Sequence, residues 1–119
     1  MEDLYLEHIL DHYRYPRNKA ALGGEHNVCS VANHGCGDEL SVLVKLGKTN
    51  KIESIVWDGT GCAISQASAS ILSDLFVGFS AKDFSAWDSK KVEQVLGIEL
   101  SAAREKCAML FVKAVEKSL

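Results

Sequence analysis

Hydrophobic residues recur with a helical period at the start of the chain. Tyr5, Ile9 and Tyr13 are four residues apart, and Leu6 adds to the same side. This spacing predicts an amphipathic helix whose apolar face carries these four side chains. Pro16 disfavours helical backbone in the residue before it, so the helix is expected to end shortly before this proline.

The middle of the chain changes to a period of two. Leu40, Val42 and Val44 occupy alternate positions, and residues 52–57 are again rich in β-branched and aromatic side chains. The sequence Gly-Lys-Thr-Asn at 47–50 lies between these two runs. Two such runs around a turn with glycine and asparagine predict an antiparallel hairpin.

Further elements on both sides of the hairpin complete the predicted fold. A third strand is expected over residues 27–32, and Gly59 and Gly61 are expected to end the sheet. Helical spacing then predicts three more helical segments, over residues 62–78, residues 88–96 and from residue 101 onward. A helix followed by strands and further helices predicts an α+β fold, a three-stranded antiparallel sheet with helices packed on it.

Length and composition predict one globular domain that comprises residues 1–119. Hydrophobic residues make up 47% and charged residues 24% of the chain, a mixture typical of folded rather than disordered proteins. The net charge of −3 disfavours a nucleic-acid-binding module, which normally has a basic excess. No apolar stretch is long enough for a membrane span, and the N-terminus lacks the features of a signal peptide. We therefore expect a cytoplasmic protein without nucleic-acid or membrane partners.

The four cysteines are the feature that this composition leaves unexplained. A chain of this length folds without disulfides or a structural metal, and the expected compartment is reducing. The cysteines are therefore more typical of metal-binding, catalytic or buried positions than of a disulfide framework. Cys29 lies in the strand expected before the hairpin and has no glycine neighbour, so we expect it to pack in the core.

The sequence Gly35-Cys36-Gly37-Asp38 is the clearest local signal for a site. Glycines add no side-chain packing, but they let backbone N–H groups approach a thiolate or a metal cluster closely. Asp38 follows Cys36 by two residues, so an extended backbone would project both side chains to the same side. A thiolate and a carboxylate there would form half of a metal site. The glycines alone also fit a loop in which the cysteine has no special role.

Two further candidate cysteines lie near the starts of predicted helices. Cys62 follows Gly-Thr-Gly and opens a helix rich in Ala and Ser, where the positive end of the helix macrodipole favours a thiolate. It also fits a buried position in a helix of small residues packed on the sheet. Cys107 follows Lys106, a cation that favours a thiolate, and it fits the apolar face of the last helix equally well.

Histidines give weaker signals. His8 and His12 are four residues apart, as in many zinc sites, but no further motif accompanies them, so a solvated or partly buried pair is expected. His34 lies two residues before Cys36 and is a minor candidate ligand beside Asp38.

Cys36, Asp38, Cys62 and Cys107 are far apart in sequence and predict a site that forms only in the folded chain. Thiolates select iron–sulfur clusters, zinc or cuprous copper. Stable [2Fe–2S] electron carriers use four cysteines, or two cysteines with two histidines. Three thiolates with one carboxylate would hold a cluster less firmly, which suits a protein that passes its cluster on.

Five short sequences, spread over nearly the whole chain, occur together in one known family. They are Leu10-Asp11-His12-Tyr13, Pro16-Arg17-Asn18, Cys36-Gly37-Asp38, Gly61-Cys62-Ala63-Ile64-Ser65 and Lys106-Cys107. In these the sequence resembles the IscU/NifU N-terminal family of iron–sulfur cluster assembly scaffolds, including its SufU branch. The resemblance implies three antiparallel strands with helices packed against them. It also implies a cluster site of Cys36, Cys62 and Cys107 with Asp38 nearby.

The resemblance further implies a function as a scaffold rather than an enzyme. A [2Fe–2S] cluster would be assembled transiently from iron bound by these ligands, and zinc can occupy the same site. Sulfur would arrive as a persulfide from a pyridoxal-phosphate cysteine desulfurase, with Cys107 as the expected acceptor. The cluster would then pass to an apo iron–sulfur protein. Asp38 matches the family aspartate associated with cluster lability.

Two features differ from the IscU branch. Lys106 stands where IscU has histidine, and residues 98–103 replace its Leu-Pro-Pro-Val-Lys chaperone motif. Lys106 and the sequence around Cys62 look more like SufU, a zinc-dependent sulfur-transfer partner of its desulfurase. Residues 78–101, however, are too few for the SufU insertion. The alternatives are therefore a SufU-like sulfurtransferase that activates a desulfurase, and a small structural zinc protein that binds partners.

Overall fold

The structure is a computed structural model that describes residues 2–23, 27–33, 35 and 37–119. The helices and strands follow one another along the chain as α1 (Glu2–Arg14), β1 (Cys29–Asn33), β2 (Asp38–Leu46), β3 (Ile52–Thr60), α2 (Ala63–Leu75), the 3₁₀ helix η1 (Ala81–Ala86), α3 (Ser89–Leu96) and α4 (Ala102–Lys117). The strands form an antiparallel sheet in the order β1-β2-β3. The predicted α+β fold with a three-stranded sheet is confirmed.

Strand β3 is longer than the sequence pattern predicts. It continues to Thr60, so Gly59 lies inside the strand and pairs with Leu40 instead of ending the sheet. A Cβ atom at Gly59 would overlap the carbonyl oxygen of Glu39. The glycine therefore marks a close approach of two backbones within the sheet rather than a strand end.

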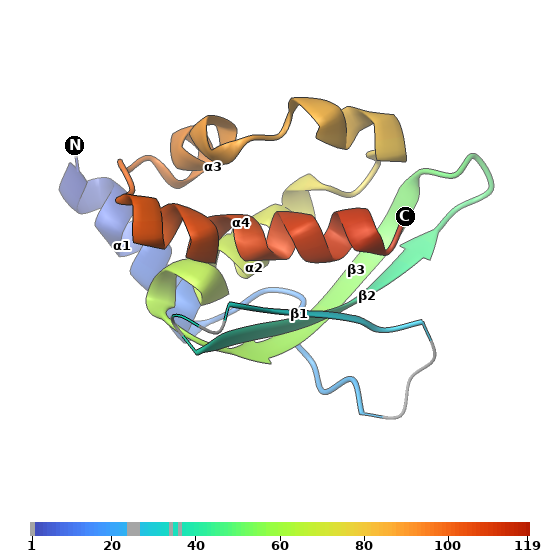
Figure 1. Cartoon of the computed structure of the whole chain (residues 1–119), viewed down its shortest axis with the longest axis horizontal. Coiled ribbons are helices and arrows are strands. Elements are labelled where there is room, and N and C mark those ends of the chain that lie inside the picture. Colours follow the sequence, from blue (N-terminus) through green and yellow to red (C-terminus); the bar gives the residue numbers. More distant parts are fainter. Residues whose placement is uncertain (1, 24–26, 34, 36) are drawn as a thin grey trace.

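The helices lie on one face of the sheet, as Figure 1 shows. Helices α2 and α4 pack on the strands, α1 packs against α2, and η1 and α3 pack against α4. Alternate strand residues point into this interface, and Leu40, Val42 and Trp57 are almost fully buried there. No helix among the described residues is both long and apolar enough to cross a membrane.

The buried face of α1 differs from the predicted one. Ile9 and His12 are buried, whereas Tyr13 is 45% and Leu6 is 48% exposed. The side chain of Tyr5 lies outside the described set. Helix α1 packs against α2, where His12 is hydrogen bonded to Ser70, so the buried face of α1 includes this polar residue while Leu6 and Tyr13 are largely exposed.

The segment after α1 covers the free margin of β3. The amide of Trp57 donates to the carbonyl of Asn18 at 3.0 Å, and the amide of Ala20 donates to the carbonyl of Trp57 at 3.0 Å. The indole Nε1 of Trp57 donates to the carbonyl of Arg17 at 2.8 Å. The sequence Pro16-Arg17-Asn18 therefore joins the end of α1 to the sheet.

The helices at the end of the chain begin with side-chain caps. Asp88 accepts a hydrogen bond from the amide of Lys91 at the start of α3, and Gly97 ends that helix with a left-handed backbone. Ser101 accepts from the amide of Arg104 at the start of α4. The last two predicted helices are thus confirmed.

Candidate metal centre

Asp38 is the first residue of β2 and is fully buried. Gly37 before it has φ of 70°, a left-handed conformation that favours glycine. Gly37 itself is therefore not extended, whereas the expected projection of the Cys36 and Asp38 side chains to one side of a strand involves a residue that the structure does not describe. Cys36 and His34 lie outside the described residues.

Cys62 is the N-cap residue of α2 and is exposed. Its amide donates to Oδ1 of Asp38 at 2.9 Å, which ties the start of α2 to the start of β2. Gly61 has φ of 151°, and a Cβ atom there would overlap the Asp38 carboxylate. The glycine in front of Cys62 therefore lets the helix start approach the carboxylate.

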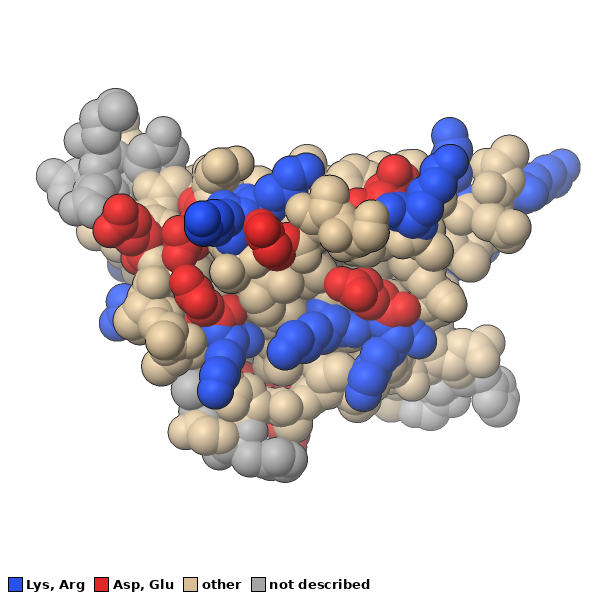
Figure 2. Space-filling model, turned by 45° about the horizontal axis from the view of Figure 1, so that its top comes forward, with Lys and Arg blue, Asp and Glu red and all other residues tan. Residues whose placement is uncertain are grey.

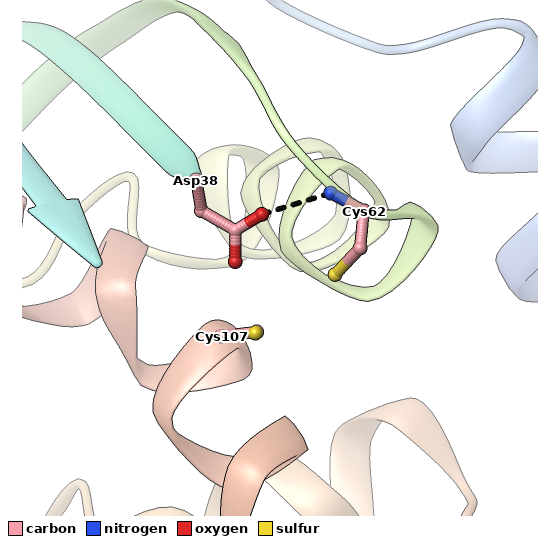
Figure 3. A group of neighbouring side chains, drawn as sticks. All are labelled: Asp38, Cys62 and Cys107. Carbon is pink, nitrogen blue, oxygen red and sulfur yellow. Dashed lines mark hydrogen bonds between the residues drawn. The ribbon is translucent and has the colours of Figure 1, made fainter. Parts of the chain in front are cut away.

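Cys107 lies near the start of α4 and is only 3% exposed. It belongs to the hydrophobic core, and its Sγ also accepts a hydrogen bond from Nδ2 of Asn33 at 3.9 Å. The sequence left a core position and a ligand position open for this cysteine. The structure makes it a core residue whose sulfur faces Asp38 and Cys62 (Figure 3).

Three predicted site residues converge at one end of the sheet. One ligand atom from each of Asp38, Cys62 and Cys107 lies within 4.8 Å of the others, as seen in Figure 3. Oδ2 of Asp38 is buried and has no hydrogen-bond partner among the described residues. A buried oxygen without a partner costs free energy. The arrangement therefore calls for a further group that binds this oxygen.

A thiophilic metal fits the donors that meet here. Tetrahedral zinc with thiolate bonds of about 2.3 Å keeps neighbouring ligand atoms about 3.8 Å apart. The three ligand atoms, at most 4.8 Å apart, reach that spacing if each moves by less than about 1 Å. Two sulfurs with one carboxylate suit zinc or an iron–sulfur cluster better than magnesium or calcium.

Two polar residues near the sulfurs were not predicted as part of the site. The thiol of Cys62 donates to Oγ of Ser65 at 3.9 Å, and Oγ of Ser65 donates to the carbonyl of Cys62 at 3.0 Å. Asn33 contacts Cys107 from the end of β1. Ser65 could have been found as the third residue after an N-cap cysteine, whereas nothing in the sequence connects Asn33 with Cys107.

The remaining candidates lie away from this centre. Cys29 is half-buried at the start of β1 and packs against the core without belonging to its buried cluster, so its predicted packing role is confirmed only in part. His8 and His12 form an edge-to-face ring pair at 4.6 Å, and Nδ1 of His12 is hydrogen bonded to Oγ of Ser70 at 2.7 Å. Burial, followed by the charges of Arg17 and His8, lowers the pKa of His12. The pair is partly buried, as predicted.

The amino-acid sequence of the chain matches a known protein family. The model of the family described as "NifU-like N terminal domain" matches residues 4–119. The chain belongs to this NifU-like family. The predicted resemblance is confirmed, and the centre formed by Asp38, Cys62 and Cys107 lies within the matched region.

Two named relatives are similar to this chain over most of its length. A protein named zinc-dependent sulfurtransferase SufU, from Bacillus subtilis, is 33% identical over all of this chain and 91% of its own length. The iron–sulfur cluster assembly scaffold protein IscU of Streptococcus pyogenes is 35% identical over 88% of this chain and 65% of its own length. The chain thus spans slightly less than two thirds of that IscU.

A solved structure supports the fold of the NifU-like chain. The crystal structure of the N-terminal part of a NifU-like protein from Brucella abortus superposes with a TM-score of 0.75, covering 98% of this chain and 92% of that one. It is 19% identical. The alignment with SufU has 138 positions for the 119 residues here, so at least 19 positions of that alignment have no counterpart in this chain.

Proposed function

We propose that this protein is a scaffold on which [2Fe–2S] clusters are assembled transiently and from which they are transferred. Residues 1–119 would form one scaffold domain. The observation that carries it is the convergence of Asp38, Cys62 and Cys107 around a buried carboxylate oxygen without a partner. Cys36, close to Asp38 in sequence, would supply the fourth ligand.

A cysteine desulfurase would deliver the sulfur as a persulfide. A scaffold thiolate attacks the outer sulfur of the donor, a new sulfur–sulfur bond forms, and the donor cysteine leaves as a thiolate. Each transferred sulfur then takes two electrons from an external reductant and becomes sulfide. Iron bound by the same ligands combines with sulfide, and the finished cluster passes to an apo iron–sulfur protein.

The exposure of the two described site thiols supports Cys62 as the one that the donor meets first. Cys62 is exposed, whereas Cys107 is 3% exposed. A persulfide at Cys107, the predicted acceptor, therefore requires local opening or transfer from Cys62. The second route is short, because both sulfurs belong to the group whose ligand atoms lie within 4.8 Å of one another. It exchanges one sulfur–sulfur bond for another and needs no further reactant.

Anaerobic reconstitution tests the scaffold function. The protein is incubated with ferrous iron, cysteine, a cysteine desulfurase and a thiol reductant, and the visible charge-transfer absorption is followed before an apo-ferredoxin is added. We expect a chromophore that moves to the ferredoxin. Cys36→Ser, Cys62→Ser and Cys107→Ser should each lose it, whereas Cys29→Ser, a matched change outside the site, should retain it. Absence of any chromophore in the parent protein would exclude the scaffold function.

A SufU-like sulfurtransferase is the second candidate. It is supported by the similarity to SufU over the whole chain and by Lys106 before the third site cysteine. In this case zinc would be a resident metal held by the same residues, and it would fix the thiolates in place. The shorter chain, with at least 19 alignment positions lacking, argues in the opposite direction.

Desulfurase kinetics and mass spectrometry separate the two functions. A persulfide on Cys62 or Cys107, together with faster desulfurase turnover but no cluster transfer, would favour the sulfurtransferase. Cluster transfer to apo-ferredoxin would favour the scaffold. Bound zinc in the purified protein fits both functions, because zinc competes for thiolate sites.

A further inference from the structure

The outer margin of β1 is an open strand edge. In the part of the chain that the structure describes, strand β1 lies at the end of the sheet and pairs with β2 alone. Among the described residues, no backbone hydrogen bond leaves residues 29–33 for a partner outside the sheet. The N–H and C=O groups of such an edge can pair with one more strand. The opposite margin of the sheet is different, because residues 18–20 cover β3 there.

Helix α4 lies beside this edge and carries a row of lysines. Lys106, Lys113 and Lys117 are exposed and line, together with β1, a groove of about 400 Å³. Leu110, which is buried, lies between them in the same groove. No carboxylate in the described part of the chain forms an ion pair with any of these lysines. Figure 2 shows several Lys and Arg side chains in the lower half of the visible face, with Asp and Glu side chains beside them.

The lysine row and the strand edge have similar lengths. From Lys106 to Lys117 the helix rises about 16 Å, at about 1.5 Å per residue. From Cys29 to Asn33 strand β1 extends about 13 Å, at about 3.3 Å per residue. An extended peptide paired with the whole of β1 would therefore pass all three lysines.

The two sides of the edge differ in charge. In a strand added to β1, alternate side chains would point to the helix side and to the outer face. The helix side offers the lysines, whereas Ser30 and Glu39 are the exposed residues in the alternating patterns of β1 and β2 and belong to the outer face. A ligand with carboxylates at every second position would match the first side and avoid repulsion on the second.

We propose that the groove between β1 and α4 binds an extended acidic segment of a partner protein as a fourth strand. Backbone hydrogen bonds to β1 would hold the segment, and Lys106, Lys113 and Lys117 would bind its carboxylates. The groove ends at Asn33, which donates to Sγ of Cys107. A partner bound in this way would therefore reach the rim of the candidate metal centre.

Binding of a short peptide to the full chain tests the proposal. The probe has glutamate at every second position and threonine between, and carries a fluorescent label for anisotropy. We expect saturable binding that weakens as salt is added, with amide NMR shifts at residues 30–33 and 106–117. Lys113→Glu combined with Lys117→Glu should weaken binding about tenfold or more. The control pair Lys48→Glu and Lys51→Glu, which makes the same charge change in the turn after β2, should change it less than about twofold.

Strand addition is tested by methylating the backbone nitrogens of the peptide along one edge or the other. Loss of affinity for one methylated peptide only is expected, because one edge faces β1. The proposal would be overturned if the two methylated peptides bound to the protein with equal affinity. It would also be overturned if the charge-reversed and control variants bound the peptide equally well. If a single-stranded oligonucleotide binds to the same lysines more tightly than the peptide does, the ligand of the groove is a nucleic acid and the proposal is wrong. If the protein dimerises with rising concentration and the amide NMR signals of β1 shift, the groove binds a second copy of this chain and the proposal is also wrong.

Discussion

The two ends of α2 lie in opposite kinds of environment. At its C-terminal end, Phe76 contacts four aromatic rings, with centroids 4.8 Å away at Phe84 and 5.0 Å away at Trp87. At its N-terminal end, Cys62 lies beside a buried carboxylate oxygen that has no partner among the described residues. The first environment is complete without any further group, and the second is not.

This difference separates what stabilises the protein from what gives it a function. Aromatic packing contributes buried apolar area and favourable ring geometry. The metal centre brings a carboxylate and two thiols together, and their interactions become favourable when a cation binds. We therefore expect substitutions at the aromatic end to change stability and substitutions at the other end to change ligand binding.

The largest expected effect on stability is that of Phe76→Ala. Removing a fully buried phenylalanine should lower the free energy of unfolding by about 3–5 kcal/mol, because it leaves a cavity among the rings. Urea unfolding of the metal-free protein measures this. Tyr15→Ala, a change at a side chain that is 70% exposed, is the control and should have little effect. Zinc affinity of the folded Phe76→Ala variant should be unchanged; a large loss would mean that the two ends of α2 are coupled.

Gly61→Ala should affect both stability and metal binding. The added Cβ overlaps the Asp38 carboxylate, and the positive φ disfavours alanine, so we expect a loss of about 1–3 kcal/mol. Zinc binding, followed with a competing chromophoric chelator, should weaken because the carboxylate is displaced. Gly78→Ala separates the two causes: Gly78 also has a positive φ, but its Cβ would meet open space. That variant should lose stability and keep its zinc affinity.

Asp38→Ala should change the stability of the metal-free protein by less than about 1 kcal/mol. The bond from the Cys62 amide is lost, but a buried oxygen without a partner is removed as well. Stabilisation by zinc should shrink in thermal unfolding, because one ligand is missing. An assembled cluster should be lost more slowly, since the exchangeable oxygen ligand is gone. Asp38→Asn keeps an acceptor for Cys62 without the charge; equal zinc stabilisation of this variant and the parent would argue against a carboxylate ligand.

The smallest expected effect is a pH dependence caused by His12. Its pKa is lowered in the folded protein, so the unfolded chain binds a proton first as the pH falls. The stability contributed by neutral His12 is therefore complete above about pH 6.5 and decreases as the pH falls towards the folded-state pKa. The free energy of unfolding, measured between pH 5 and 8, should decrease in this way as the pH falls. His12→Gln should reduce this pH dependence, whereas His8→Gln, a change at an exposed histidine, should largely retain it.

Much of the fold follows from local patterns. The hairpin, the third strand and the last two helices were predicted because each is specified by neighbouring residues, such as the caps Asp88 and Ser101. The buried face of α1 was predicted wrongly, because a histidine that is polar in sequence becomes buried by bonding to Ser70 on α2. The spacing of hydrophobic residues cannot predict a buried polar residue whose hydrogen-bond partner lies on another helix.

The sequence by itself determined the types of ligand and the elements that carry them. Cysteine and aspartate set the choice of metal, and the glycines at 37 and 61 allow the backbone to approach. Only the tertiary structure decided that Asp38, Cys62 and Cys107 meet within 4.8 Å and that one oxygen of Asp38 is left without a partner among the described residues. The tertiary structure also places the lysines of α4 beside the open edge of β1. Local sequence fixes backbone preference and side-chain chemistry, whereas distances between remote residues arise from how the helices pack on the sheet.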